Sequence, residues 1–132
     1  MTQRNIDAMD CIVDKIGEFK SISRALKCVY SKRDVEIPFN DKMFDVELST
    51  LKMSKKAINA LMRAGLKTIN DVIKYTEDRS LKKIKNFGET SGVELLETIL
   101  DLAWIKMTEE EKVAFLIDVV QRNEEHLRPE VM

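Results

Sequence analysis

The strongest constraint on the fold is a dense series of helix start and stop signals in the second half of the sequence. Ser54 is expected to cap a helix that Gly65 ends, because a hydroxyl accepts from free N–H groups and glycine adopts the left-handed conformation that closes a helix. The stretches Thr68–Asp71 and Thr108–Glu111 have the spacing of a capping box. The second is expected to begin a last helix that runs to about Glu125. These signals predict short helices joined by connections of a few residues.

An amphipathic helix is expected at the N-terminal end. Apolar residues recur from Ile6 to Phe19 within an arc of about 140° on a helical projection. Ile22 and the apolar residues after it leave that arc, so a break is expected near residues 20–22. Residues 31–46 have no helical period and contain Pro38, so they are expected to form a connector.

Further helix-start and turn signals lie between the capped segments. Thr76 is expected to begin a short turn. Residues 86–88, which read Asn-Phe-Gly, are typical of a tight turn. After that turn, either Thr90 or Ser91 is expected to cap a longer helix that runs toward Ala103.

Composition agrees with helices and indicates no membrane contact. Of the 132 residues, 44% are hydrophobic and 34% charged, with only four Gly and two Pro. No apolar run approaches the roughly 20 residues that cross a bilayer, and the N-terminus lacks the apolar core of a signal peptide. Two cysteines, Cys11 and Cys28, make no disulfide framework and are expected to be reduced and buried. The sequence therefore predicts a cytoplasmic, all-α protein.

The sequence contains few residue patterns that are typical of catalytic or metal-binding sites. The single histidine, His126, lies in a polar tail without nearby cysteine ligands. The sequence contains no phosphate-binding loop, no G-x-G-x-x-G, no C-x-x-C and no H-E-x-x-H. We therefore expect a protein that is not an enzyme, with no catalytic residues, no metal and no cofactor.

Charge is distributed unevenly along the sequence, although the net charge is only −1. Residues 52–85 contain ten basic and three acidic side chains, whereas residues 101–132 contain four basic and eight acidic ones. The basic stretch predicts a surface that faces an anion such as nucleic acid. The alternative is a solvated lysine-rich face that serves solubility.

The most informative element is a basic turn that leads into a helix. Lys82, Lys83 and Lys85 precede Gly88, and the helix expected after it would point its first N–H groups outward at the positive end of its dipole. That arrangement suits a phosphate, and the lysines would add contacts that release counterions. The spacing is that of a helix–hairpin–helix motif, which holds the DNA backbone without reading bases.

A longer stretch, from about Val46 to Leu100, resembles the C-terminal domain of the bacterial RNA polymerase alpha subunit. The resemblance covers about 55 residues in the right order and spacing. It rests on Leu51-x-x-Ser54, Ala57-x-Asn59-x-Leu61, Ala64-Gly65-Leu66-x-Thr68, Asp71-Val72, Thr76 with Leu81, Ile84-Lys85-Asn86-Phe87-Gly88, Ser91 and Glu94.

The resemblance implies a small helical domain that docks on the minor groove of A/T-rich DNA and also contacts activators and sigma factor. The family's groove-entering arginine corresponds to Lys56 here, and its assisting asparagine to Asn59. The hairpin glycine corresponds to Gly88, the hydroxyl at the helix start to Ser91, and the acidic residue one turn later to Glu94.

Two departures bear on DNA binding. Lys56 keeps the charge of the family's arginine but lacks the planar fork that suits a narrow minor groove. Where the family has a basic pair after the hairpin glycine, this sequence has Glu89 and Thr90, and Glu89 is expected to repel phosphate.

The resulting expectation is a compact bundle of short helices with a helix–hairpin–helix-like core, flanked by N-terminal and C-terminal helices. Residues 1–45 would form a helical segment and connector, residues 46–105 the module that resembles the polymerase domain, and residues 106–132 an acidic helix packed on the module or on a partner. The expected function is transcription-associated binding of double-stranded, A/T-rich DNA. The residues expected to contact DNA are Lys56, Asn59, Lys82, Lys83, Lys85, Gly88 and Ser91.

Two alternatives remain open at this point. One is a protein-interaction module that binds RNA polymerase, sigma factor or an activator with little DNA affinity, using Glu94 in its interface. The other concerns the last helix, which is apolar on two sides. Phe115 and Val119 lie opposite the main apolar stripe, so they are either buried against the N-terminal helix or form a homodimer interface. Trp104 is expected to anchor the core against this helix.

Overall fold

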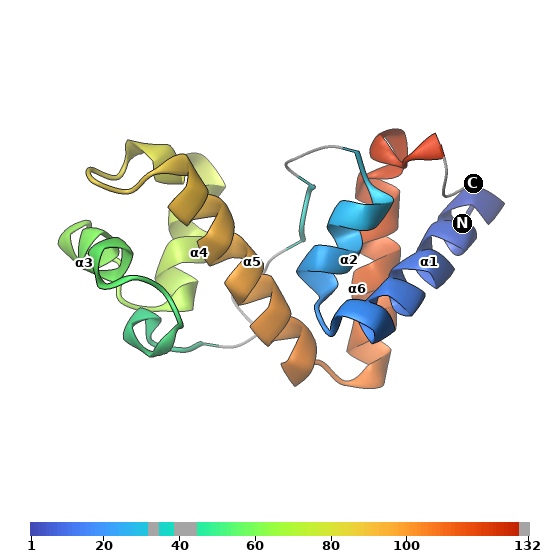
Figure 1. Ribbon diagram of the computed structural model, residues 1–132, viewed down its shortest axis with the longest axis horizontal. Coiled ribbons are helices and arrows are strands. Elements are labelled where there is room, and N and C mark those ends of the chain that lie inside the picture. Colours follow the sequence, from blue (N-terminus) through green and yellow to red (C-terminus); the bar gives the residue numbers. More distant parts are fainter. Residues whose placement is uncertain (32–34, 39–44, 130–132) are drawn as a thin grey trace. The chain divides into compact units, whose positions relative to one another are not determined.

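The computed structural model describes residues 1–31, 35–38 and 45–129 (Figure 1). These residues form six α-helices and three short 3₁₀ helices, and none of them belongs to a named β-strand. The prediction of an all-α fold is therefore confirmed. Among the described helices, none is long and apolar enough to cross a membrane. The expected connector lies partly outside the described residues, and its part 35–38 is in neither helix nor strand.

The protein divides into two compact units. One, the terminal unit, combines Met1–Pro38 with Trp104–Met132, and the other, the central unit, is Phe39–Ala103. The sequence predicts three consecutive segments instead. The difference arises because the helices that flank the central module in sequence pack against each other.

In the terminal unit, α1 (Gln3–Phe19) packs against both α2 (Ile22–Val29) and α6 (Glu109–Arg122). Lys20 adopts a left-handed φ of 58° and ends α1, and the hydroxyl of Ser21 caps α2. The break near residues 20–22 is thus confirmed.

The residues that follow α6 pair with the residues that follow α2. The last α-helix stops at Arg122, earlier than predicted, and is followed by the 3₁₀ turn η3 (Glu124–His126). Asn123 between them is fully buried, and its side chain exchanges hydrogen bonds of 2.7 and 2.8 Å with the backbone of Glu36. Tyr30 and Leu127 form an isolated antiparallel bridge.

Phe115 and Val119 are buried, with 8% and 0% of their surfaces exposed. The Phe115 ring lies 6.5 Å from that of Trp104, centroid to centroid, so Trp104 packs on the last helix. Of the two alternatives for this helix, burial is the one found for these two side chains. The two cysteines are also less buried than predicted, because Cys11 is half-buried and Cys28 is exposed.

The central unit contains η1 (Leu48–Thr50), α3 (Lys55–Arg63), α4 (Ile69–Asp78), η2 (Leu81–Lys83) and most of α5 (Glu89–Lys106). These elements share one hydrophobic core, to which every one of them contributes. Its fully buried members include Leu48, Leu61, Ile69, Val72 and Leu95.

The predicted caps of α3 and α4 are confirmed. The Ser54 hydroxyl accepts from the Ala57 N–H at 3.2 Å, and Gly65 follows α3 with a φ of +84°. Thr68 and Asp71 form a capping box at the start of α4, as Thr108 and Glu111 do at the start of α6.

Two predicted starts are wrong. Thr76 does not begin a turn, because α4 continues through it to Asp78 and the hydroxyl of Ser80 caps η2 instead. Neither Thr90 nor Ser91 caps α5, which already begins at Glu89.

Candidate nucleic-acid interface

The first turn of α3 presents two exposed lysines, Lys55 and Lys56. No acidic residue lies in that turn. Positive charge at a helix N-terminus opposes the helix dipole and costs stability in the free protein. The same charges would be favourable next to an anion, where lysine and dipole attract it together.

Asn59 and Arg63 extend this charged side along α3. Residues three and seven positions after Lys56 share its side of a helix, and both are exposed. The family resemblance indicates Lys56 and Asn59 but not Arg63. The signal that identifies Arg63 is its spacing, which adds a guanidinium two turns beyond Lys56.

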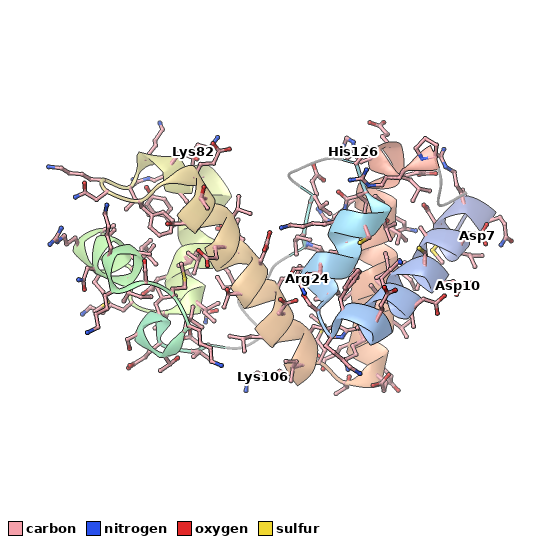
Figure 2. The ribbon with its side chains drawn as sticks, viewed as in Figure 1. Asp7, Asp10, Arg24, Lys82, Lys106 and His126 are labelled. Carbon is pink, nitrogen blue, oxygen red and sulfur yellow. The ribbon has the colours of Figure 1, made fainter. Side chains whose placement is uncertain are left out.

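The turn before α5 is held by apolar side chains, and this turns its lysines outward. Leu81, Ile84 and Phe87 are buried in the core of the central unit, with 7%, 6% and 4% of their surfaces exposed. The residues between them, Lys82, Lys83 and Lys85, are all exposed. Figure 2 shows Lys82 at the surface of this turn.

The backbone conformation of this turn depends on Asn86, which has a φ of 65°, and not on Gly88. Gly88 is exposed, and a Cβ at its position would meet no atom within 4 Å. The folded protein therefore does not need a glycine there for packing. The bare backbone leaves the space in front of α5 open to a ligand.

The N-terminus of α5 offers backbone donors. Its first intrahelical hydrogen bond runs from the Gly92 N–H to the Gly88 carbonyl, at 3.0 Å. The N–H groups of Thr90 and Ser91 precede that bond, so they have no acceptor within the helix. Because Gly88 has no side chain, the residue before the helix cannot cap these groups. They can donate to a phosphate oxygen.

Glu89 works against this arrangement. Its carboxylate lies in the first turn of α5, 3.6 Å from the ammonium of Lys82. Both side chains are largely exposed, so the ion pair contributes little to stability. It does place a negative charge at the proposed phosphate site and partly neutralises one of the three lysines.

The two helix starts belong to one structural core. Ala57, Ala60 and Leu61 of α3 are in the same buried cluster as Leu81 and Ile84 of the turn. In Figure 1 the turn before α5 (yellow) and α3 (green) lie at the same end of the central unit. The residues expected to bind DNA are thereby held by one core.

Charges outside the two helix starts are also exposed. All ten basic residues of the stretch 52–85 are solvent-exposed, and among them only Lys82 forms an ion pair with a described partner. Glu94 is exposed one turn after Ser91 on α5. Phe115 and Val119 belong to the terminal unit.

A shallow hollow on the central unit has a different character. It lies between the end of α3 and α4, and its charged lining residues are of both signs, namely Asp71, Lys74, Asp78 and Arg79. The Arg79 guanidinium lies 5.8 Å from the centroid of the Tyr75 ring. Because its charged lining residues are of both signs, this hollow is a poor anion site. No cluster of three or more potential metal ligands occurs within the described residues.

Residues 36–101 match the family model for the C-terminal domain of the alpha subunit of bacterial RNA polymerase. The curated relatives include DNA-directed RNA polymerase alpha subunits. That of Mesostigma viride is 30% identical over 93 residues, which cover 70% of this protein and 29% of the relative.

Two further alpha subunits match in different ways. That of Gloeobacter violaceus is 41% identical over 56 residues, covering 42% of this protein and 18% of the relative. That of Trichodesmium erythraeum is 27% identical over 114 residues, covering 86% of this protein and 36% of the relative. The sequence thus spans only a minor part of these relatives. No solved structure matches it.

Proposed function

This protein belongs to the family of the C-terminal domain of the bacterial RNA polymerase alpha subunit, and from that premise we propose that it is a non-enzymatic, transcription-associated DNA-binding protein. The DNA surface is formed by the two helix starts of the central unit. Lys56, Asn59 and Arg63 enter or line the minor groove from α3. Gly88 and Ser91 at the start of α5 hold the phosphate backbone.

The observation that carries this proposal is the exposure of all ten basic side chains between residues 52 and 85 on a unit of modest size. Exposed, mostly unpaired lysines release counterions when they neutralise phosphates, and this supplies the sequence-independent part of DNA affinity. Backbone donors at the start of α5 position the phosphate. A preference for A/T arises because A/T-rich minor grooves are narrow and strongly negative.

Arg63 bears on the first departure from the family pattern. Lys56 is a point charge and cannot make the planar, bidentate contacts of an arginine. A guanidinium on the same side of α3 supplies such a group, two turns along the helix. We therefore assign groove contact to the pair rather than to Lys56 alone.

A second function is favoured by two specific features of the same surface. Glu89 lowers the positive potential at the start of α5 through its ion pair with Lys82. Met62 on α3 is 44% exposed, and an exposed methionine is common at protein-binding surfaces. Both suit a module that binds RNA polymerase, sigma factor or an activator with little DNA affinity.

Fluorescence anisotropy of a labelled A/T-rich duplex, titrated with the 132-residue protein across a salt series, distinguishes the two functions. DNA binding predicts affinity that falls steeply with salt, and a Lys56→Ala variant that binds about three- to tenfold more weakly with a salt slope reduced by about one. The matched control is Lys106→Ala, which removes one exposed lysine from the terminal unit. Absent binding, or equal losses in both variants, would favour the protein-interaction function.

A further inference from the structure

The outward side of α1 carries apolar surface that the terminal unit leaves uncovered. The sequence predicts a single apolar arc on this helix, from Phe19 through Ile12 to Ile6. Ile12 is fully buried, whereas Val13 is 55% exposed and Ile6 38% exposed. The arc is therefore wider than the part of it that the core of this unit covers.

Acidic side chains lie beside this uncovered edge. At 100° per residue, Asp7, Asp10 and Asp14 fall within about 120° of Ile6 and Val13 around the helix. All three are exposed. In Figure 2, Asp7 and Asp10 project from the side of α1 opposite α2 and α6. We refer to Ile6, Asp7, Asp10, Val13 and Asp14 together as the α1 face.

The carboxylates of the α1 face make no ion pair with another described residue. Asp7 accepts a hydrogen bond of 3.0 Å from the side-chain amide of Gln3, which is neutral. Lys15, which follows Asp14, pairs instead with Glu18 at 3.2 Å, and Arg4, three residues before Asp7, forms no ion pair with a described residue. Among the described residues, no ion pair is found for Asp7, Asp10 or Asp14. The surface therefore combines exposed aliphatic side chains with uncompensated negative charge.

The same side of the helix permits close approach by another element. Gly17 lies four residues after Val13, and a Cβ at its position would meet no atom within 4 Å. Glycine inside a helix lowers its stability relative to alanine. The flat surface at Gly17 adjoins the exposed Val13 side chain, and a helix can pack closely there.

We propose that the α1 face is a docking surface for a basic amphipathic segment of another protein, a helix whose apolar stripe is flanked by lysine and arginine. Exposed apolar side chains rimmed by charge are typical of interaction surfaces. The charge selects the partner, because a second copy of α1 would bring carboxylates against carboxylates, whereas a basic helix complements them. This inference concerns the terminal unit and does not depend on the proposed DNA binding.

The test uses the ¹⁵N-labelled 132-residue protein and three synthetic peptides of about 18 residues, long enough to form a helix. The first is an amphipathic leucine–lysine helix, the second has the same composition in scrambled order, and the third replaces lysine with glutamate. The expected result is saturable amide shifts at the α1 face with the leucine–lysine helix alone. Val13→Glu should weaken this binding at least about tenfold.

Val113→Glu is the matched control, because Val113 lies on α6 in the same unit and is 52% exposed, nearly as much as Val13. It should bind the leucine–lysine helix normally. The double variant Asp10→Lys, Asp14→Lys should lose that peptide and bind the leucine–glutamate helix. Since both aspartates are exposed, this variant keeps the proposal testable if Val13→Glu fails to fold.

Several results would overturn the proposal. One is equal binding of the scrambled peptide, which would indicate attraction by charge alone. Another is the absence of shifts at the α1 face with the leucine–lysine helix. A third is self-association of the free protein that Val13→Glu abolishes, which would assign the α1 face to a second copy.

Discussion

Lys82 and Glu89 face each other across the turn that leads into α5, with the Lys82 ammonium nitrogen 3.6 Å from a carboxylate oxygen of Glu89. The same turn presents the backbone donors that we assign to phosphate. A bound phosphate and the Glu89 carboxylate would therefore compete for the same cation and the same positive helix end. The ion pair should limit DNA affinity rather than support the fold.

Glu89→Lys should raise DNA affinity about tenfold at low salt and steepen the salt slope by about one to two. The substitution removes a repelling charge, frees Lys82 and adds a cation. Anisotropy titrations across a salt series measure both effects. Glu77→Lys on α4 changes the charge of the same unit equally, so a similar gain in that control would attribute the effect to net charge and contradict a local role.

Asp71→Asn should destabilise the central unit by about 0.5–1 kcal/mol at neutral pH, because the carboxylate of Asp71 completes a cap. The Lys67 N–H donates to this carboxylate at 2.9 Å and the Thr68 N–H at 3.1 Å, and these bonds, that from Lys67 first, lower the pKa of Asp71 below its ordinary value of 3.8.

The sign of the pH dependence follows from that lowered pKa. The contribution of Asp71 to stability is present above about pH 4 and is lost as the pH falls through the lower folded-state pKa. Denaturant unfolding from pH 7 to pH 2 should show a shallower acid loss in Asp71→Asn. Asp78→Asn, at the other end of α4, should retain the wild-type acid loss. An unchanged acid limb in Asp71→Asn would refute the assignment.

Tyr30→Phe should not destabilise the terminal unit at pH 7. It should raise the free energy of unfolding by up to about 1 kcal/mol. Tyr30 is 1% exposed and its hydroxyl has no hydrogen-bond partner within the described residues. Burial raises the pKa of Tyr30 to about 12 from its ordinary 10.0. The folded state holds the phenolic proton of Tyr30 more tightly than the unfolded state does. The contribution of this proton to the free energy of unfolding is therefore complete below pH 10 and is lost as the pH rises toward 12.

Unfolding at high pH and spectrophotometric titration of the phenols test this account of Tyr30. Wild-type stability should fall between pH 10 and pH 12, and Tyr30→Phe should reduce that fall. A marked loss of stability in Tyr30→Phe at pH 7 would show that the hydroxyl has a partner.

Gly17→Ala should stabilise the terminal unit by about 0.5–1 kcal/mol, because alanine favours the helix and a Cβ at this position meets no atom. Gly65→Ala is the opposite case, since its φ of +84° strains any other residue. Thermal or denaturant unfolding of both variants gives the comparison. A destabilised Gly17→Ala variant would mean that this side of α1 is crowded.

The sequence was sufficient where structure depends on neighbouring residues. Ser54, Thr68 and Thr108 each cap a helix through a hydrogen bond to a backbone group three residues on, and such bonds depend on local spacing alone. The break at Lys20 was predictable for the same reason, because the apolar period changes direction there.

The sequence does not predict the features that depend on tertiary packing. The start of α5 depends on Phe87, whose buried ring fixes the turn so that Asn86 takes the left-handed conformation and the helix begins directly after Gly88. Periodicity likewise identifies two apolar sides on the last helix but cannot tell which of them is covered. In the folded protein Phe115 and Val119 are both buried, and the Phe115 ring lies beside that of Trp104.

The sequence predicts which residues make up the candidate site better than it predicts how they are arranged in space. Lys56, Asn59, Gly88 and Ser91 follow from the resemblance to the polymerase domain, and the first three are exposed. The ion pair of Lys82 with Glu89 depends on how the turn folds back, which no local pattern specifies.

The central claim is that the starts of α3 and α5 bind DNA together, and amide NMR of the 132-residue protein tests it most directly. Titration with an A/T-rich duplex should shift the amides of Lys56 and Asn59 together with those of Gly88 and Ser91, at lower DNA concentrations than a G/C-rich duplex of equal length requires. Shifts confined to one of the two helix starts, shifts located elsewhere, or equal responses to both duplexes would contradict the account.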